Sequence, residues 1–155
     1  MTKRTDTLAA GRPAIPARRR RRGNGVLEAA LVLPVLLSLS MGMVEFGQFF
    51  YMKHTIQAAS RDAARTAILS SVTHAQAQAA ATSTMNAAGV SDTTKYSVTF
   101  VNASGGATIA DVGTAAKGTS IKVTVSSTAG QISVRPLGVI TANRPIVGIT
   151  TMIKE

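Results

Sequence analysis

The sequence predicts an α+β protein with one long N-terminal helix, a second, alanine-rich helix and a small antiparallel sheet. Three observations lead to this fold class. Residues 29–44 are uncharged and mostly apolar, apolar or small residues then recur every three or four positions as far as residue 67, and two later segments alternate with a period of two. The first two patterns are typical of helices, and the third is typical of half-buried strands.

Composition limits the kind of protein that this chain can form. Its 155 residues suffice for one small domain and a membrane anchor, but not for two full-sized domains. Aromatic residues make up 4% of the chain and tryptophan is absent, so a core built from Ala, Val, Ile and Leu is expected to be modest. The absence of cysteine excludes disulfides, thiol nucleophiles and cysteine-bound metal clusters.

Most of the formal net charge of +10 lies in a basic leader, residues 1–23. This segment has eight basic residues and one acidic residue, a net +7, which leaves +3 for the rest of the chain. Five of the basic residues are consecutive: Arg18, Arg19, Arg20, Arg21 and Arg22. Arginines beside a membrane segment hold that end of the chain in the cytoplasm. Arginine runs also bind nucleic acids, but no aromatic residues are interleaved here to stack on bases, so no nucleic-acid partner is predicted.

The apolar run that follows predicts a transmembrane helix at residues 24–51. A cleaved secretory signal also begins with basic residues, but its apolar region spans only about 7 to 15 residues, so the length favours an anchor in membrane lipid. Glu28 and Glu45 would lie about 25 Å apart along a helix, slightly less than the roughly 30 Å hydrocarbon core, so each is expected near one interface. An aromatic belt is expected at the outer interface, formed by Phe49, Phe50 and Tyr51.

Residues inside this helix are candidates for packing against another helix. Pro34 cannot donate an amide hydrogen bond to the carbonyl of Ala30, so a kink or a loosened turn is expected there. Ser38 and Gly42 stand four residues apart and would either offer a small-residue face to another helix or simply face lipid. Glu45 completes the set of candidate packing residues.

Residues 52–89 predict an amphipathic continuation of the first helix and then a second helix. Small or apolar residues recur at Met52, Ile56, Ala59, Ala63 and Ala67, while charged residues occupy the other faces, so this part needs a protein surface to cover it. Residues 70–73 are rich in hydroxyl and β-branched side chains and are expected to interrupt the helix. The second helix is expected at residues 74–88, with Gly89 as its C-terminal stop.

Residues 90–155 predict a small β-rich domain. Residues 96–101 and 121–125 alternate with β-branched side chains, and residues 146–153 form a plausible third strand. Turn-forming residues at 102–106 and 113–118 separate them. The simplest architecture is an antiparallel sheet packed on a helix.

The sequence does not predict a catalytic, metal or cofactor site. His54 and His74 are the only histidines, and their spacing of 20 does not match a helical metal pair, so both are expected to face solvent. The serines and threonines do not lie in a GxSxG or SxxK motif, which are typical of nucleophilic catalysis. Gly105-Gly106 is not followed by the Gly-Lys-Ser/Thr sequence that ends a P-loop motif. We therefore expect no enzymatic activity.

Residues 23–67 closely resemble the N-terminal region of TadE-like proteins, the pseudopilins of the bacterial tight-adherence (Tad/Flp) pilus system. The shared features are a glycine followed shortly by V-L-E, an apolar run containing L-P, an E-F-G near its end and the closing stretch A-A-S-R-D-A-A-R. Ala29 stands where the major pilins of this system carry tyrosine, which favours a minor pilin. A second helix, a V-T-V strand and a P-L-G segment extend the resemblance in outline, and a pilin-like fold is implied.

The resemblance implies a processing site and an assembly residue. Pilins of this kind are cut after a glycine by a prepilin peptidase on the cytoplasmic side of the membrane, and the fifth residue of the mature chain is glutamate. With cleavage between Gly23 and Asn24, Glu28 is the fifth residue. The implied partners are the prepilin peptidase, other pilins or pseudopilins and the pilus assembly platform. The implied location is the bacterial inner membrane or the pilus itself, with residues 90–155 outside the cytoplasm.

Glu28 has a physical reason to act in assembly. A bare carboxylate at the membrane edge is costly, but in a packed filament it can pair with the new α-amino group of a neighbouring subunit. Alternatively, it only stabilises the first turn of the helix through the helix dipole. Two other classes of protein are alternatives: a permanently anchored envelope binding or sensor module, which would not need this glutamate, and an envelope enzyme, which would need a site that the sequence lacks.

Overall fold

The structure is a computed structural model that describes residues 24–155, so Gly23 and the five arginines of the leader lie outside the described residues. The chain divides into two units, with the boundary between Pro34 and Val35. The described part of the first unit is helical throughout. The second unit contains the rest of that helix and all other elements, which form the expected α+β fold.

Helix α1 (Asn24–Ala67) has two different surfaces. It continues through Pro34, where the unit boundary falls, and the side chains described between residues 25 and 41 are all exposed. Further along, Met52, Ile56, Ala59 and Ala63 are buried at helical spacing. The prediction of an amphipathic continuation is therefore confirmed, and the alanines allow the backbone of α1 to approach its neighbours closely.

Helix α2 (His74–Ala87) begins and ends close to the predicted positions. Thr73 and Gln76 form a capping box, in which each side chain satisfies the backbone of the other residue. Gly89 follows the helix with φ of +87°, a conformation that glycine adopts without steric cost. One side of α2, with Ala77, Ala81 and Met85, is buried.

The sheet contains three antiparallel strands in the order β1-β2-β3, as predicted. Strand β1 (Tyr96–Asn102) follows a short 3-10 helix η1 (Thr93–Lys95), and β2 (Ser120–Thr128) pairs with both β1 and β3 (Pro145–Ile153). The observed strands are one to four residues longer than the predicted ones because pairing continues into residues that carry no alternating apolar signal.

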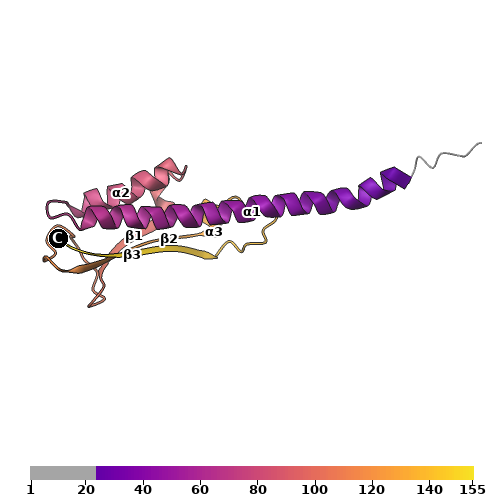
Figure 1. The fold of residues 1–155 in the computed structure, drawn as a ribbon. Helices are drawn as coiled ribbons and strands as arrows, with labels where there is room; N and C mark the ends of the chain where they lie inside the picture. Colours follow the sequence, from indigo (N-terminus) through magenta and orange to yellow (C-terminus); the bar gives the residue numbers. More distant parts are fainter. Residues whose placement is uncertain (1–23) are drawn as a thin grey trace, which may run out of the picture. The chain divides into compact units, whose positions relative to one another are not determined.

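The core lies between the helices and one face of the sheet. Figure 1 shows α2 and the second half of α1 side by side, with the strands along them. Inward-facing residues of the sheet, including Phe100, Val123 and Val125, belong to one buried cluster with residues of α1 and α2. On the other face of the sheet, Ser97 and Thr99 are exposed, so a single layer of helices covers the sheet.

Helix α1 and strand β3 meet at very short range. A Cβ atom added to Gly148 would lie 2.6 Å from the carbonyl oxygen of Ile56, so only glycine fits there. Beside this contact, the Ser60 and Thr150 hydroxyls are 2.9 Å apart, and the Gln57 side-chain amide donates to the carbonyl of Ile149 at 3.0 Å. These bonds satisfy polar groups inside an otherwise apolar contact.

The C-terminal residues are fixed to the end of α1. Lys154 is only 4% exposed, and its Nζ donates to the carbonyls of Val112 at 2.6 Å and Leu69 at 3.5 Å. The next amide, of Glu155, donates to the carbonyl of Ile68 at 3.2 Å. The buried ammonium group is thus satisfied by backbone carbonyls.

Two features differ from the sequence-based expectations. A short helix α3 (Ala129–Ile132) and the loop after it, residues 133–144, lie between β2 and β3, where no structure was predicted. His74 does not face solvent: it is half-buried, with its ring edge-on to Phe100 at a centroid distance of 4.6 Å. The spacing of the histidines excluded a metal pair but carried no information about this aromatic contact.

Candidate membrane helix and assembly site

Glu28 lies on an exposed part of α1. The described helix begins at Asn24, so Glu28 is its fifth residue, and the first turn holds no acidic side chain. An exposed carboxylate among exposed apolar side chains is accessible to a group from another molecule.

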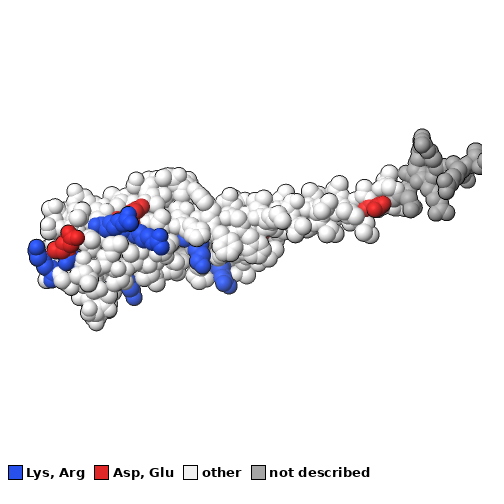
Figure 2. All heavy atoms as spheres, in the orientation of Figure 1, with Lys and Arg blue, Asp and Glu red and all other residues white. Residues whose placement is uncertain are grey.

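Helix α1 is long and apolar enough to cross a membrane, and the apolar stretch is not covered by the rest of the chain. A core helix of a soluble protein would be mostly buried, whereas none of this stretch is buried. Figure 2 shows the charged side chains gathered over the part that holds α2 and the sheet, while the helical surface toward the N-terminus is almost free of charge on the face shown. An apolar N-terminal helix of this kind fits membrane anchoring.

Glu45 is covered by a loop of the same chain, residues 133–144. It has no exposed surface, and its carboxylate accepts hydrogen bonds from the amides of Leu137 at 3.0 Å and Ile140 at 2.6 Å. The sequence predicted Glu45 near the outer interface and as a candidate packing residue, and it did not predict a partner within the chain. In the structure its carboxylate holds residues 133–144, which we call the Glu45 loop.

Further contacts hold the Glu45 loop on α1. The Arg135 guanidinium donates to the carbonyl of Ile140 at 2.9 Å, and Gly138 adopts a φ of +68° that lets the chain reverse between the two bonded amides. Leu137 approaches Gly42, where an added Cβ would lie 3.9 Å from its Cδ1. The predicted small-residue face is therefore only partly open: Ser38 is exposed, but Gly42 is partly covered by this loop.

A pocket of about 300 Å³ lies between α1 and the Glu45 loop. Its lining is mostly apolar and aromatic, and consists of Phe46, Phe49, Phe50, Val139, Ile140, Thr141 and Arg144. Two of these residues belong to the predicted aromatic belt, and the rings of Phe49 and Phe50 pack edge to face at 5.7 Å. The sequence did not predict the pocket, because its second wall comes from a loop without any periodic pattern.

Acidic and histidine side chains do not gather into a metal site. Among residues 24–155, no group of three or more His, Asp or Glu residues is placed to hold a metal ion. The acidic residues have separate roles: Glu45 holds its loop, and Asp111 accepts from the amides of His74 and Gly113. The features that could act on other molecules are thus the exposed helix, Glu28 and the pocket.

Comparison with known proteins gives one match. The family model described as "TadE-like protein" matches residues 23–65, the segment that carries Gly23, Glu28 and most of α1. No curated protein and no solved structure matches the chain. The matched segment agrees with the resemblance identified in the sequence. Over most of its long N-terminal helix, this chain is therefore similar to TadE-like proteins.

Proposed function

We propose that this chain is a pseudopilin, or minor pilin, of a tight-adherence pilus system that is cleaved by a prepilin peptidase between Gly23 and Asn24. The observation that carries the proposal is the TadE-like match over residues 23–65. Within this match, a cut after Gly23 makes Glu28 the fifth residue, which is the register implied by the resemblance. The uncovered apolar surface of α1 supports membrane insertion before assembly.

In this proposal, the basic leader and Glu28 act in sequence. Five arginines on the cytoplasmic side resist extraction of α1 from the membrane, and cleavage removes them and creates an α-amino group. The Glu28 carboxylate then pairs with the α-amino group of a neighbouring subunit, which satisfies a charge that would be costly in an apolar packing. Residues 90–155 lie outside the cytoplasm and contact other pilins or the assembly platform.

Cleavage is tested by intact mass and N-terminal sequencing of the membrane-extracted protein, expressed with and without a cognate prepilin peptidase. We expect a new N-terminus at Asn24 only when the peptidase is present. Gly23→Val should abolish cleavage, whereas Gly25→Ala is a matched control because the added Cβ would contact nothing else in residues 24–155 beyond its own stretch of helix. An uncut chain in both samples would contradict the proposal and favour a permanently anchored binding or sensor module.

The assembly role of Glu28 is tested in cells that make the pilus. Glu28→Ala should leave cleavage, membrane level and the fold of residues 35–155 unchanged but reduce incorporation of the subunit into sheared pili. Glu28→Gln tests the charge itself, and Leu31→Ala is a control on the same exposed helix. Normal incorporation of both Glu28 variants would refute the proposed pairing.

A further inference from the structure

We infer that the pocket between α1 and the Glu45 loop binds one phospholipid of the outer leaflet, with the lipid phosphate at Arg144 and an acyl chain against Phe46, Phe50 and Val139. The inference rests on the membrane anchoring that is part of the proposed function, but not on cleavage or pilus assembly. It assigns a ligand to a site formed by this chain alone.

The shape and lining of the pocket suit an amphiphile. Its volume of about 300 Å³ is at the lower end of the range for small-molecule sites, enough for a headgroup region and the beginning of an acyl chain. Phe46, Phe50 and Val139 are 47%, 52% and 60% exposed, so the pocket opens at the surface with apolar walls. In water such walls would be unfavourably hydrated, whereas lipid chains would cover them.

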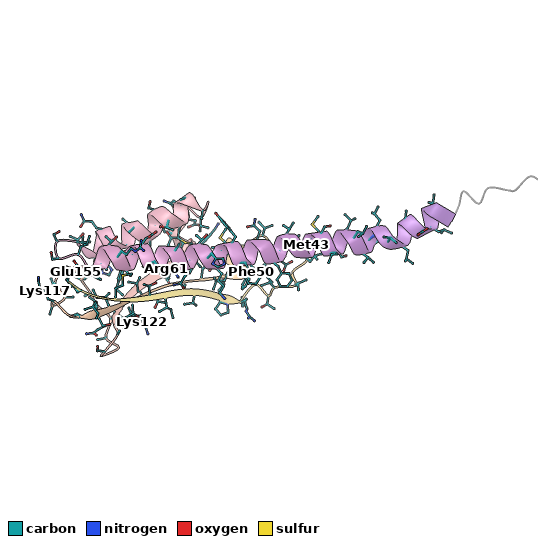
Figure 3. The ribbon with its side chains drawn as sticks, viewed as in Figure 1. Met43, Phe50, Arg61, Lys117, Lys122 and Glu155 are labelled. Carbon is teal, nitrogen blue, oxygen red and sulfur yellow. The ribbon has the colours of Figure 1, made fainter. Side chains whose placement is uncertain are left out.

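The position of the pocket places it beside the membrane segment. The Glu45 loop runs along the part of α1 that carries Met43 and Phe50, both labelled in Figure 3. Exposed apolar residues of the loop, Val134, Leu137 and Val139, add to the exposed apolar surface of α1 at this level. The only carboxylate here, that of Glu45, is already satisfied by two loop amides, so it does not oppose insertion into the interface.

Charge distinguishes a lipid from other occupants. Residues 133–144 contain two arginines and no acidic residue. Arg135 is engaged with the carbonyl of Ile140, but within residues 24–155 the Arg144 guanidinium has no hydrogen-bond partner. A guanidinium binds phosphate oxygens in a bidentate manner, and arginine at a membrane edge extends its charge toward the headgroups while its stem stays in apolar surroundings. A phospholipid offers both groups together.

Lipid retention tests the phosphate contact. The full-length protein is reconstituted in vesicles of phosphatidylcholine and phosphatidylglycerol, extracted in mild detergent and analysed by native mass spectrometry for bound phospholipid. We expect one retained lipid on the wild type and a loss of roughly tenfold in occupancy for Arg144→Gln, the size of effect expected for one charge-assisted contact. Arg61→Gln, which removes an exposed arginine elsewhere on α1, should retain the lipid. Equal retention by Arg144→Gln and the wild type would overturn the inference.

Spin labelling tests the position of the pocket. The chain has no cysteine, so Val139→Cys and Thr99→Cys each give one labelling site. A nitroxide at position 139 should collide more with oxygen than with a water-soluble nickel chelate, and one at position 99, on the open face of the sheet, should do the reverse. A water-exposed label at 139 would overturn the inference. Shielding of the label at 139 from the nickel chelate only at a high protein-to-lipid ratio would also overturn the inference, because a second copy of the chain would then occupy the pocket. Both tests use protein produced in cells without the peptidase, which separates them from the test of processing.

Discussion

Glu45 accepts hydrogen bonds from two amides that lie 92 and 95 residues further along the chain. From the sequence, its place after an apolar run predicted only that it would be near a membrane interface. Nothing in residues 133–144 signals the partnership, because the bonds come from backbone amides that every residue except proline possesses. Side-chain identity alone could not have revealed this contact, whereas the role of Gly89 could be predicted because it depends on glycine itself.

Removing the Glu45 carboxylate should release the loop that it holds. In Glu45→Ala, the amides of Leu137 and Ile140 lose their acceptors, so their hydrogen exchange should accelerate by roughly tenfold or more. Glu45→Gln keeps one amide oxygen as acceptor and should show a smaller effect. Hydrogen-exchange mass spectrometry of the detergent-solubilised chain measures both, and unchanged exchange in Glu45→Ala would show that the loop is held by other contacts.

Asp92 gives a prediction about pH. The Thr94 hydroxyl donates to its carboxylate at 2.7 Å and the Thr94 amide at 3.0 Å, which holds the pKa of Asp92 below its ordinary value of 3.8. The folded state therefore binds this proton more weakly than the unfolded state does. The stabilisation is present above the ordinary pKa and is lost as the pH falls through the lowered one.

Thr94→Ala should raise the pKa of Asp92 toward its ordinary value. The hydrogen bond from the Thr94 hydroxyl, which lowers the pKa most, is lost, while the hydrogen bond from the Thr94 backbone amide remains. An NMR titration of the Asp92 carboxyl carbon measures the shift. Thr93→Ala is the matched control, since its hydroxyl makes no hydrogen bond to Asp92. A pKa that stays equally low in Thr94→Ala would mean that the backbone amide alone accounts for it.

Among the elements, those with a repeating pattern could be predicted and those without could not. The strands were located because alternating side chains meet one buried face, and α2 because alanines and a glycine stop define its length. Helix α3 and the Glu45 loop escaped prediction because a segment of this length without periodicity has no single preferred structure. The pocket wall that the Glu45 loop forms was missed for the same reason.

The contact between α1 and β3 should be intolerant of even one added methyl group. In Gly148→Ala, the new Cβ would lie 2.6 Å from the Ile56 oxygen and 2.8 Å from its carbonyl carbon, and backbone atoms cannot move aside as a flexible side chain can. We expect a loss of about 1 to 3 kcal/mol or more in the free energy of unfolding. Gly105→Ala, with open space around the new Cβ, should change it by less than about 0.5 kcal/mol. Thermal unfolding of the wild type and the two variants in the same detergent measures these differences in stability.

Considered as a whole molecule, the chain separates its functions along the sequence. Seven of the ten net positive charges lie in the leader, and the next stretch of α1 is apolar on all sides. The buried alanines and the sheet that covers them come after it. This order can be read from composition alone, so the long apolar helix and the α+β fold after it could be predicted, whereas the local contacts between loop and helix could not.

The whole-molecule topology can be measured with single cysteines. In spheroplasts without the prepilin peptidase, a membrane-impermeant maleimide should label Ala75→Cys on α2 and should leave Thr7→Cys in the leader unlabelled until the cells are lysed. Because the wild type has no cysteine, it should not react with the maleimide and serves as the negative control. Labelling of position 7 in intact spheroplasts would reverse the proposed orientation.

The burial of Lys154 has a practical consequence for reporter design. Any sequence appended after Glu155, such as an affinity tag or a fluorescent protein, begins one residue beyond an ammonium group locked among carbonyls of Val112 and Leu69. Tension or crowding at that junction would pull directly on the last strand and on the end of α1. The turn at Gly105, exposed and surrounded by open space, offers a safer place for an epitope insertion in imaging experiments.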